Sequence, residues 1–513
     1  MYYIFLSSFL IGIGCAYGLY KYLTWHFDYW VKKRIPGPKP KVLFGTFPGT
    51  VNGSRNFIYD LDEVYNKFSK KARFIGVFNT RNPQIFILDP ILCKDILISN
   101  FTCFQDNESS KWMDRAREPI SGSNPFVLPF VDWKVKRSEF VPGLTSSKVK
   151  SMMPIITSIG DKLVAHLKEK VKNGKCTIDA KEVALYYTGE VVADVVWGVQ
   201  AGNFEMLERE GTIQESPFLS MSKRMIGQTF KAFKYFFILG IFPFVKYLIY
   251  VRFFPEVTDR FFLKLTHSTL QNRRALLKVP RSDFLQHLVE LQMKKGLNLT
   301  EVLAHMLTFH FDGFETSATL ISHCLLLLAR CLEKQGRLRA EINEYMLTHN
   351  DVVEFSDLMK LPYLEQCIAE TLRIFAPLPF MAKVCTNPCI LENNDGVNLE
   401  VQPGEVCLIS IHSMHHDEQY FPQPEEFIPE RFADENGGVK KYRDMGVYMP
   451  FGDGPRICLG MTFGLAQAKA AIAVLVKHFQ LTVNGKTRKD NYQSPGGFIT
   501  GLEGGIFIDF EEL

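Results

Sequence analysis

The sequence predicts a mainly α fold with small β-sheets (α+β), built as one large domain behind an apolar N-terminal helix. Apolar runs with helical period are long and numerous, whereas strand-like runs are few and short. No internal repeat and no Gly/Ser linker divides residues 41–513. Hydrophobic residues make up 46% of the 513 and charged residues 22%, which supplies a core and excludes a disordered chain.

The charge balance and the cysteine count exclude two further classes. Lys and Arg number 59 against 55 acidic residues, and the formal net charge of +4 predicts no nucleic-acid partner. Eleven cysteines in 513 residues are too sparse for a disulfide framework. We therefore expect a reducing compartment.

Residues 2–20 form an uncharged apolar run that is long enough to cross a bilayer as a helix. Lys21 ends the run and a basic cluster follows at 32–34, so the positive-inside rule places the rest of the chain in the cytosol. We expect residues 1–34 to be a membrane anchor with a basic linker, and residues 35–513 to be the catalytic domain. A cleaved signal peptide is the alternative, but the run has no basic n-region and no clear cleavage site.

The body shows strand-like runs near residues 74–88, 397–410 and 498–510. The clearest helix is predicted from Asn298 to about Arg330, where Asn298 and Glu301 form a capping box. At 1.5 Å per residue this helix is about 50 Å long and crosses the whole domain.

A second apolar stretch covers residues 235–254 and contains Lys246 and Arg252. It leaves three alternatives open: a second membrane span, a surface that rests on the membrane, or buried core. A lysine at bilayer depth costs a few kcal/mol, which disfavours the span, and snorkelling cations favour the membrane surface.

The most informative segment runs from Phe451 to Gly460, with the sequence Phe-Gly-Asp-Gly-Pro-Arg-Ile-Cys-Leu-Gly, and precedes an apolar helical run at 461–479. Cys458 lies just before that helix, so backbone amides and the positive helix end are expected to favour its thiolate, the form that binds a metal. The glycines allow a tight turn and a close approach of a flat ligand.

This pattern, Phe-x-x-Gly-x-Arg-x-Cys-x-Gly before a helix, resembles the haem-binding loop of the cytochrome P-450 family at every defining position. Other landmarks of the family follow in order: Glu370 and Arg373 as Glu-x-x-Arg, and residues 429–432 as Pro-Glu-Arg-Phe. The resemblance implies a buried charge network of these groups and haem b as the cofactor, with a cysteine thiolate on its iron. It also implies the haem contacts Trp133, Arg137, Lys383, Phe451, Arg456 and Cys458. Lys383 stands where the family usually has an arginine, so it keeps the charge and loses the guanidinium fork.

Residues 312–317, Asp-Gly-Phe-Glu-Thr-Ser, resemble the family's distal-helix signature. The resemblance makes Glu315 and Thr316 the catalytic residues, a carboxyl and hydroxyl relay that delivers protons during oxygen activation. Asp312 departs from the usual Ala or Gly, which would narrow or polarise the pocket.

The resemblance implies a microsomal haem-thiolate monooxygenase that inserts one oxygen atom from O2 into a xenobiotic, hormone or lipid. Within the family, the sequence is most similar to insect members that act in detoxification. The chain has no flavin fingerprint and no iron–sulfur spacing, so electrons are expected from an NADPH–cytochrome reductase, with a cytochrome b-type protein as a second donor. The expected location is the endoplasmic reticulum membrane. Two alternatives remain open, a haem-thiolate isomerase or dehydratase that rearranges a peroxide without external electrons, and a non-enzymatic haem sensor.

Overall fold

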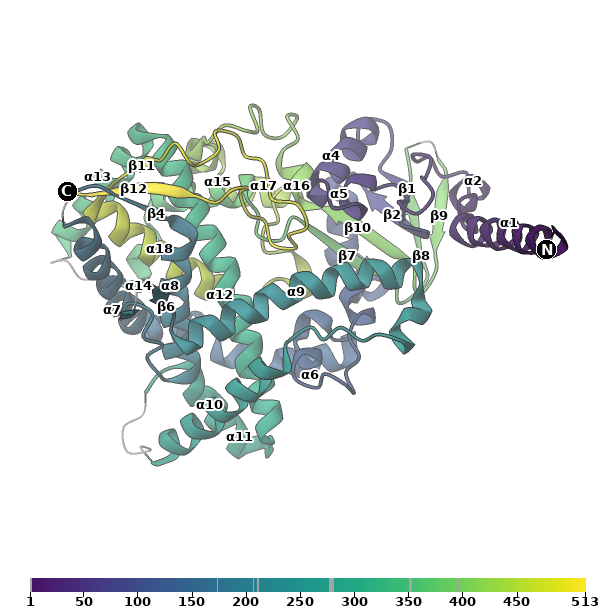
Figure 1. Cartoon of the computed structure of the whole chain (residues 1–513). Coiled ribbons are helices and arrows are strands. Elements are labelled where there is room, and N and C mark those ends of the chain that lie inside the picture. The colour runs from purple at the N-terminus through teal and green to yellow at the C-terminus, as the bar shows by residue number, and fades with distance from the viewer. Residues whose placement is uncertain are drawn as a thin grey trace.

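Long helices form most of the molecule and small sheets lie at its edges, which confirms the predicted mainly α fold (Figure 1). The computed structural model describes residues 2–172, 174–205, 207–209, 212–275, 281–349, 353–394 and 396–513. Its long helices are α1 (Tyr2–Thr24), α4 (Phe57–Phe68), α6 (Phe130–Phe140), α7 (Ser146–Val171), α8 (Ala180–Val192), α9 (Pro217–Ile241), α10 (Glu256–Ala275), α11 (Phe284–Lys295), α12 (Leu299–Arg330), α13 (Leu332–Thr348), α15 (Pro362–Ile374) and α18 (Met461–His478). Shorter helices are α2 (Tyr29–Lys32), α3 (Pro48–Val51), α5 (Pro90–Lys94), α14 (Phe355–Leu358), α16 (Ile411–His415) and α17 (Gly438–Asp444).

The central helix α12 begins and ends where the sequence predicts. The Asn298 side chain accepts from the Glu301 amide at 3.0 Å, and the Glu301 carboxylate accepts from the Asn298 amide at 2.9 Å, which confirms the capping box. Most residues of α12 are buried, and the helix packs against α8, α18 and α10 (Figure 1). It therefore runs through the core, and its middle turns line the cavity described below.

A five-stranded sheet has the order β1-β2-β10-β7-β3. Its strands are β1 (Phe74–Asn79), β2 (Asn82–Ile87), β10 (Val406–Ser410), β7 (Phe380–Val384) and β3 (Asp106–Asn107). The other sheets join β11 (Phe479–Val483), β12 (Phe507–Glu512) and β4 (Cys176–Asp179), pair β8 (Cys389–Glu392) with β9 (Asn398–Val401), and pair β5 (Leu207–Arg209) with β6 (Thr212–Gln214).

Two of the three predicted strand regions are confirmed, and the prediction for the third is wrong over more than half of its residues. The run at 498–510 becomes a strand only from Phe507. Gly504 and Gly505 have φ of +83° and +90°, a left-handed backbone that cannot continue a β ladder. The apolar residues before them form an irregular segment instead.

Helix α1 projects from one end of the molecule, and its residues from Tyr3 to Lys21 are exposed, whereas Leu23 near its end is buried (Figure 1). Within the described ranges, α1 is the single helix that is both long enough and apolar enough to cross a membrane. The helices α12 and α13 meet these criteria of length and composition only when they are taken together as one bent pair. Since α12 is a buried core helix, α1 is the segment compatible with a membrane anchor.

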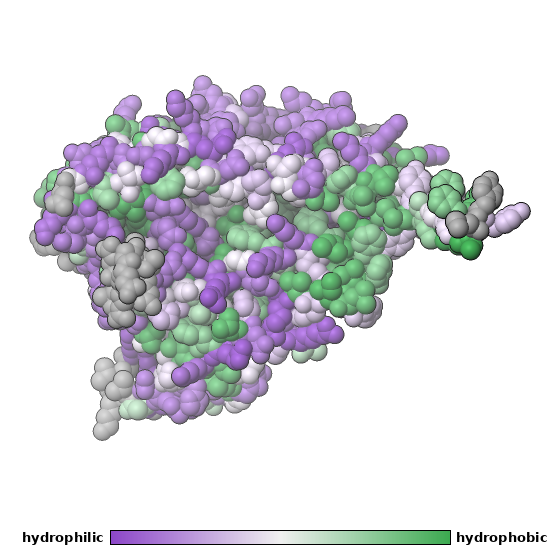
Figure 2. All heavy atoms as spheres, viewed as in Figure 1, coloured by the Kyte–Doolittle hydropathy of each residue, from purple (hydrophilic) through white to green (hydrophobic). Residues whose placement is uncertain are grey.

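The apolar stretch at 235–254 does not form one continuous helix. Helix α9 ends at Ile241, and Pro243 starts the short helix η8 (Pro243–Tyr247), so a second membrane span through this stretch is wrong. Its apolar side chains Ile238, Phe244, Tyr247, Leu248 and Ile249 are exposed, which contradicts buried core in the middle of the stretch, whereas Tyr235 and Phe254 at its ends are buried. Figure 2 shows apolar atoms gathered on the side of the body next to α1, over the end of α9. We call these five residues the apolar patch.

Candidate functional site

A cavity of about 340 Å³ lies between α12, α6, β7 and the loop that precedes α18. Cys458 lines it from the loop, and Asp312, Gly313 and Thr316 line it from α12. Most of the other lining side chains are apolar, and many are phenylalanines. The structure thus brings the predicted thiol and part of the predicted distal signature to one cavity.

The loop from Phe451 to Gly460 is fixed by its own backbone. The Cys458 amide donates to the Phe451 carbonyl at 3.0 Å, and Gly464, in the first turn of α18, donates to the Gly460 carbonyl at 2.7 Å. Gly454 has a φ of +69°, and a Cβ there would lie 2.0 Å from the Leu97 carbonyl oxygen. Only glycine therefore fits this turn, which holds Cys458 toward the cavity.

The amides at the start of α18 lower the pKa of the Cys458 thiol, as the sequence predicts, but burial acts in the opposite direction. Burial raises the pKa of the Cys458 thiol to about 11. The Gly460 and Met461 amides and Arg137 lower this pKa, but they do not outweigh burial and the nearby carboxylate of Asp312. A cation at the sulfur is needed to hold the anionic form, as a metal ion does.

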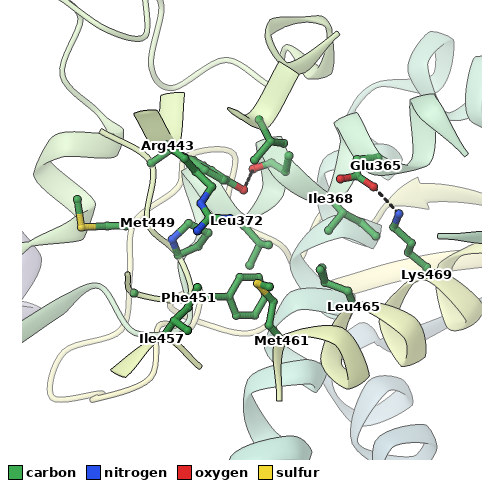
Figure 3. Close-up of a pocket in the computed structure, with 15 residues that line it drawn as sticks. Glu365, Ile368, Leu372, Arg443, Met449, Phe451, Ile457, Met461, Leu465 and Lys469 are labelled. Carbon is green, nitrogen blue, oxygen red and sulfur yellow. Dashed lines mark hydrogen bonds and ion pairs between the residues drawn. The ribbon is translucent and has the colours of Figure 1, made fainter. Parts of the chain in front are cut away.

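The side of the loop away from this cavity encloses a second pocket of about 190 Å³ (Figure 3). Phe451, Ile457 and Met461 form an apolar wall of this pocket, and Lys469 pairs with Glu365 at 2.6 Å at its rim (Figure 3). Phe451 also lines the main cavity, so this residue lies between the two spaces.

Predicted cationic contacts converge on one side of the main cavity. Trp133 and Arg137 lie one turn apart on α6, and the Trp133 ring has the Arg456 guanidinium carbon 4.5 Å and that of Arg137 5.4 Å from its centroid. Arg137 also donates to the Ile457 carbonyl at 3.1 Å, next to Cys458. All three side chains line the cavity.

Lys383 reaches the same side of the cavity from β7, where it is only 2% exposed. Its ammonium donates to the Asn107 side chain at 3.0 Å. Burial first and the charge of Arg456 second lower the pKa of Lys383 to about 7. Among the described residues on this side of the cavity, Arg137, Lys383 and Arg456 are three cations, and Asp106 pairs with Arg456 at 3.4 Å.

The predicted Glu-x-x-Arg network is buried and complete. Arg373 donates to Glu370 at 2.7 and 2.9 Å, and Arg431 donates to the same carboxylate at 3.2 Å. The side chains of Glu370 and Arg373 are fully buried. Arg373 also donates to the His415 carbonyl, and the His415 ring accepts from the Met449 amide at 3.1 Å. The network is thereby linked to the segment that leads into the thiol loop.

The two predicted catalytic residues of α12 face different surroundings. Thr316 lines the cavity, and its hydroxyl donates to the Asp312 carbonyl at 2.5 Å. Glu315 is not among the residues that line the cavity, and its carboxylate pairs with Lys181 of α8 at 2.9 Å. A proton route from Glu315 to the cavity would therefore require this ion pair to open.

Sequence reasoning did not find Lys181 or Asn124 as neighbours of the site. Lys181 holds Glu315, and the Asn124 amide donates to the Asp312 carboxylate at 3.3 Å. No local pattern marks either residue, because each meets α12 only through the tertiary fold. From the sequence alone, a lysine at the start of a helix such as α8 is expected to be an ordinary solvated charge on the surface.

The residues present fit the haem that the resemblance implies. Cys458 offers a sulfur ligand, and the apolar walls suit a flat macrocycle. The surplus positive charge of Arg137, Lys383 and Arg456 suits its two carboxylates, which would offset the cost of burying these cations. Trp133, Arg137, Lys383, Phe451 and Arg456 would hold the group and Cys458 would bind its iron.

Comparisons with known proteins show which family the chain is related to. A profile of the cytochrome P450 family matches residues 35–507. The chain is 40% identical over 496 residues to "Probable cytochrome P450 28d1" of Drosophila melanogaster, which covers 96% of each chain, and 38% identical over 513 residues to "Probable cytochrome P450 28a5" of the same species, which covers 99% of each. It is 28% identical over 505 residues to "Cytochrome P450 6a2" of that species, covering 95% of this chain and 96% of the relative. The chain therefore belongs to the cytochrome P450 family, whose members are haem-thiolate monooxygenases.

Proposed function

We propose that this protein inserts one oxygen atom from O2 into a lipophilic small molecule, with electrons from an NADPH-dependent flavoprotein reductase. The observation that carries the proposal is the cavity that presents the Cys458 thiol together with the Thr316 hydroxyl in mainly apolar surroundings. Apolar walls bind a lipophilic guest and exclude water.

When bound, the haem supplies the oxygen-activating chemistry. Cys458 is the proposed ligand of its iron, and Trp133, Arg137, Lys383 and Arg456 bind and orient its carboxylates. Phe451 shields the sulfur from the second pocket.

Thr316 and Glu315 are the proposed catalytic residues. The Thr316 hydroxyl holds a proton at the cavity surface, and Glu315 resupplies it from the Lys181 side when the ion pair opens. The mainly apolar lining of the cavity keeps bulk water from competing with this delivery. Phenylalanines supply much of that lining: Phe230, Phe253, Phe309, Phe311, Phe380 and Phe498.

The proposed electron donor is an NADPH–cytochrome reductase, with a cytochrome b-type protein as a second donor. Lys134 of α6 and Lys441 of α17 are exposed and suit an acidic flavoprotein. Three further basic residues of this region are already paired within the chain, Lys136 with Glu139, Lys440 with Asp444 and Arg443 with Asp453. If the exposed lysines guide docking, added salt weakens reductase binding.

The proposed location is the endoplasmic reticulum membrane, with residues 1–34 as the anchor and residues 35–513 as the catalytic domain on the cytosolic face. The exposed apolar helix α1 supports the anchor, and the basic cluster that follows it supports the orientation.

Reconstitution in lipid with a reductase tests the proposal. Turnover of a lipophilic substrate should require NADPH, reductase and O2 together, and product formed under isotopically labelled O2 should carry one labelled oxygen atom. Product formed from a peroxide with no NADPH would favour the isomerase or dehydratase instead. Ligand binding with no NADPH consumption for any substrate would favour the non-enzymatic sensor.

A further inference from the structure

Asp312 is an acidic group in an otherwise apolar part of the cavity. It belongs to the turn of α12 that also presents Gly313 and Thr316, and its exposed surface faces the cavity, which it lines. Phe253, Phe309 and Phe311 line the same space. Asp312 keeps an exposed surface toward the cavity, which a guest would cover, and desolvation by the surrounding protein raises its pKa to about 7.

The other charged side chains that line the cavity have partners or a role already described. Arg137, Lys383 and Arg456 lie on the proposed carboxylate-binding side of the haem site. Asp453 accepts from the Gly454 amide at 2.8 Å and pairs with Arg443 at 3.5 Å. Within the part of the chain that the structure describes, Asp312 has no ion-pair partner.

One neighbour holds the Asp312 carboxylate in place without neutralising it. The Asn124 side-chain oxygen accepts from the Phe126 amide at 2.8 Å, which turns the NH2 group of Asn124 toward Asp312 at 3.3 Å. A single neutral amide donor satisfies only part of the hydrogen-bonding capacity of a carboxylate. The remaining lone pairs are available to a guest in the cavity.

We propose that Asp312 is a specificity residue that binds the protonated nitrogen of a lipophilic amine substrate. This inference rests on the proposed function, whose substrate class it names. An ammonium group forms a charge-assisted hydrogen bond with the carboxylate, while the rest of the molecule packs on the phenylalanine rings. A neutral molecule of the same shape leaves the desolvated carboxylate uncompensated and binds more weakly.

The test compares two probes of almost the same shape, 1-benzylpiperidine, which is protonated at neutral pH, and cyclohexylmethylbenzene, which is neutral. Binding to the haem-loaded full-length protein is measured by calorimetry and by the shift of the Soret band. Wild-type protein should bind the amine at least about tenfold more tightly than the neutral probe, which is a typical effect of one charge-assisted hydrogen bond.

Asp312→Asn should remove this preference, because it keeps the size and the contact with Asn124 and loses the charge. Asp312→Glu should retain a preference for the amine. The matched control is Asp132→Asn, which removes one exposed carboxylate of α6 that pairs with Arg115 outside the cavity, and should leave the preference unchanged.

An amine preference that persists in Asp312→Asn, or that is absent from the wild-type protein, would overturn the inference. Either result leaves the proposed function intact if the neutral probe still binds and is oxidised with NADPH and reductase. Failure of the proposed function would instead appear as no oxidation of either probe, while the two binding constants still test Asp312.

Discussion

The Thr316 hydroxyl is the proton-bearing side chain of α12 that the structure places both in the cavity and in the predicted relay. It donates to the Asp312 carbonyl at 2.5 Å, one turn earlier in the helix. This bond engages the single hydroxyl proton of Thr316, so its oxygen can accept a hydrogen bond from the relay, and the hydroxyl donates into the cavity once it turns away from the Asp312 carbonyl.

Thr316→Ala should therefore retain haem and consume NADPH but lose product. With the proton donor removed, we expect product per NADPH to fall by about tenfold or more, with the lost electrons appearing as hydrogen peroxide. Thr316→Ser keeps the hydroxyl and is the matched control. Equal coupling of NADPH use to product in the alanine and wild-type proteins would refute the relay.

Residues whose role is set by a local pattern could be predicted from the sequence. Cys458 stands in a contiguous loop motif, and Trp133 and Arg137 are spaced by one helical turn. The protonation of Cys458 and the pairing of Glu315 with Lys181 could not be predicted, because burial and contacts between distant segments decide them. The amides at the start of α18 lower the pKa of Cys458 as the sequence predicts, but the net shift is upward because burial outweighs them.

The segment before the thiol loop depends on α15 for its position. Glu370 and Arg373 of this helix, together with Arg431, form a fully hydrogen-bonded buried group that reaches Met449 through His415. Because this segment leads into the loop that carries Cys458, the buried charges of α15 help to hold Cys458 in position.

Glu370→Ala should lower the free energy of unfolding by about 3–5 kcal/mol, because it leaves two buried guanidinium groups without their carboxylate. Urea unfolding of the haem-loaded protein measures this loss, and retention of haem should fall with it. Glu333→Ala, at an exposed position of α13, is the matched control and should change stability by less than about 0.5 kcal/mol. A Glu370→Ala protein as stable as this control would exclude the structural role.

The Glu139 carboxylate of α6 forms hydrogen bonds with Lys295 of α11 and His305 of α12. Burial acts to raise the pKa of Glu139, but hydrogen bonds from His305, Lys295 and Lys136 outweigh it, so the pKa lies well below 4.5. The carboxylate therefore stabilises the fold above about pH 4.5, and this contribution is lost as the pH falls further.

Glu139→Gln should be less stable than wild type at pH 7, and the difference should shrink on acidification below pH 4.5. Denaturant midpoints at several pH values measure it. Glu169→Gln on the exposed face of α7 is the control, since its carboxylate pairs only at the surface with Lys172. A stability difference for Glu139→Gln that stays constant down to acid pH would contradict this assignment.

Helix ends and strand ends differ in how well the sequence predicts them. The capping box of α12 is a local signal, and the helix starts where it predicts. The strand expected from residue 498 starts at Phe507, since its pairing depends on β11 and β4, which come from distant parts of the chain. Strand partners must be brought together by the whole fold.

At the scale of the whole molecule, α1 and the apolar patch lie on the same side of the body (Figures 1 and 2). Tyr22 of α1 donates to the Ile241 carbonyl at 2.8 Å and its ring stacks on Phe242 with the centroids 6.1 Å apart. The anchor and the patch can therefore meet one membrane together. Composition predicted both segments, but only the tertiary structure shows that they are adjacent.

Deletion of residues 2–20 should leave a protein that still binds lipid vesicles, because the apolar patch remains exposed. Adding Leu248→Asp and Ile249→Asp to the deletion should release it into solution, as measured by vesicle flotation. Ile91→Asp is a control at an exposed apolar residue outside the patch. Complete loss of vesicle binding on deletion of the anchor alone would contradict a role for the patch.

The absorption spectrum of the reduced protein under carbon monoxide tests the central claim, that Cys458 binds the haem iron as a thiolate. The wild-type protein should give the red-shifted Soret band of a thiolate–iron–carbonyl complex. Cys458→Ser should lose this band, and Cys176→Ser, at a cysteine on β4, should keep it. A wild-type protein that takes up haem but shows the Soret band of an imidazole-ligated carbonyl complex, or a Cys458→Ser protein with the unchanged wild-type band, would contradict the account.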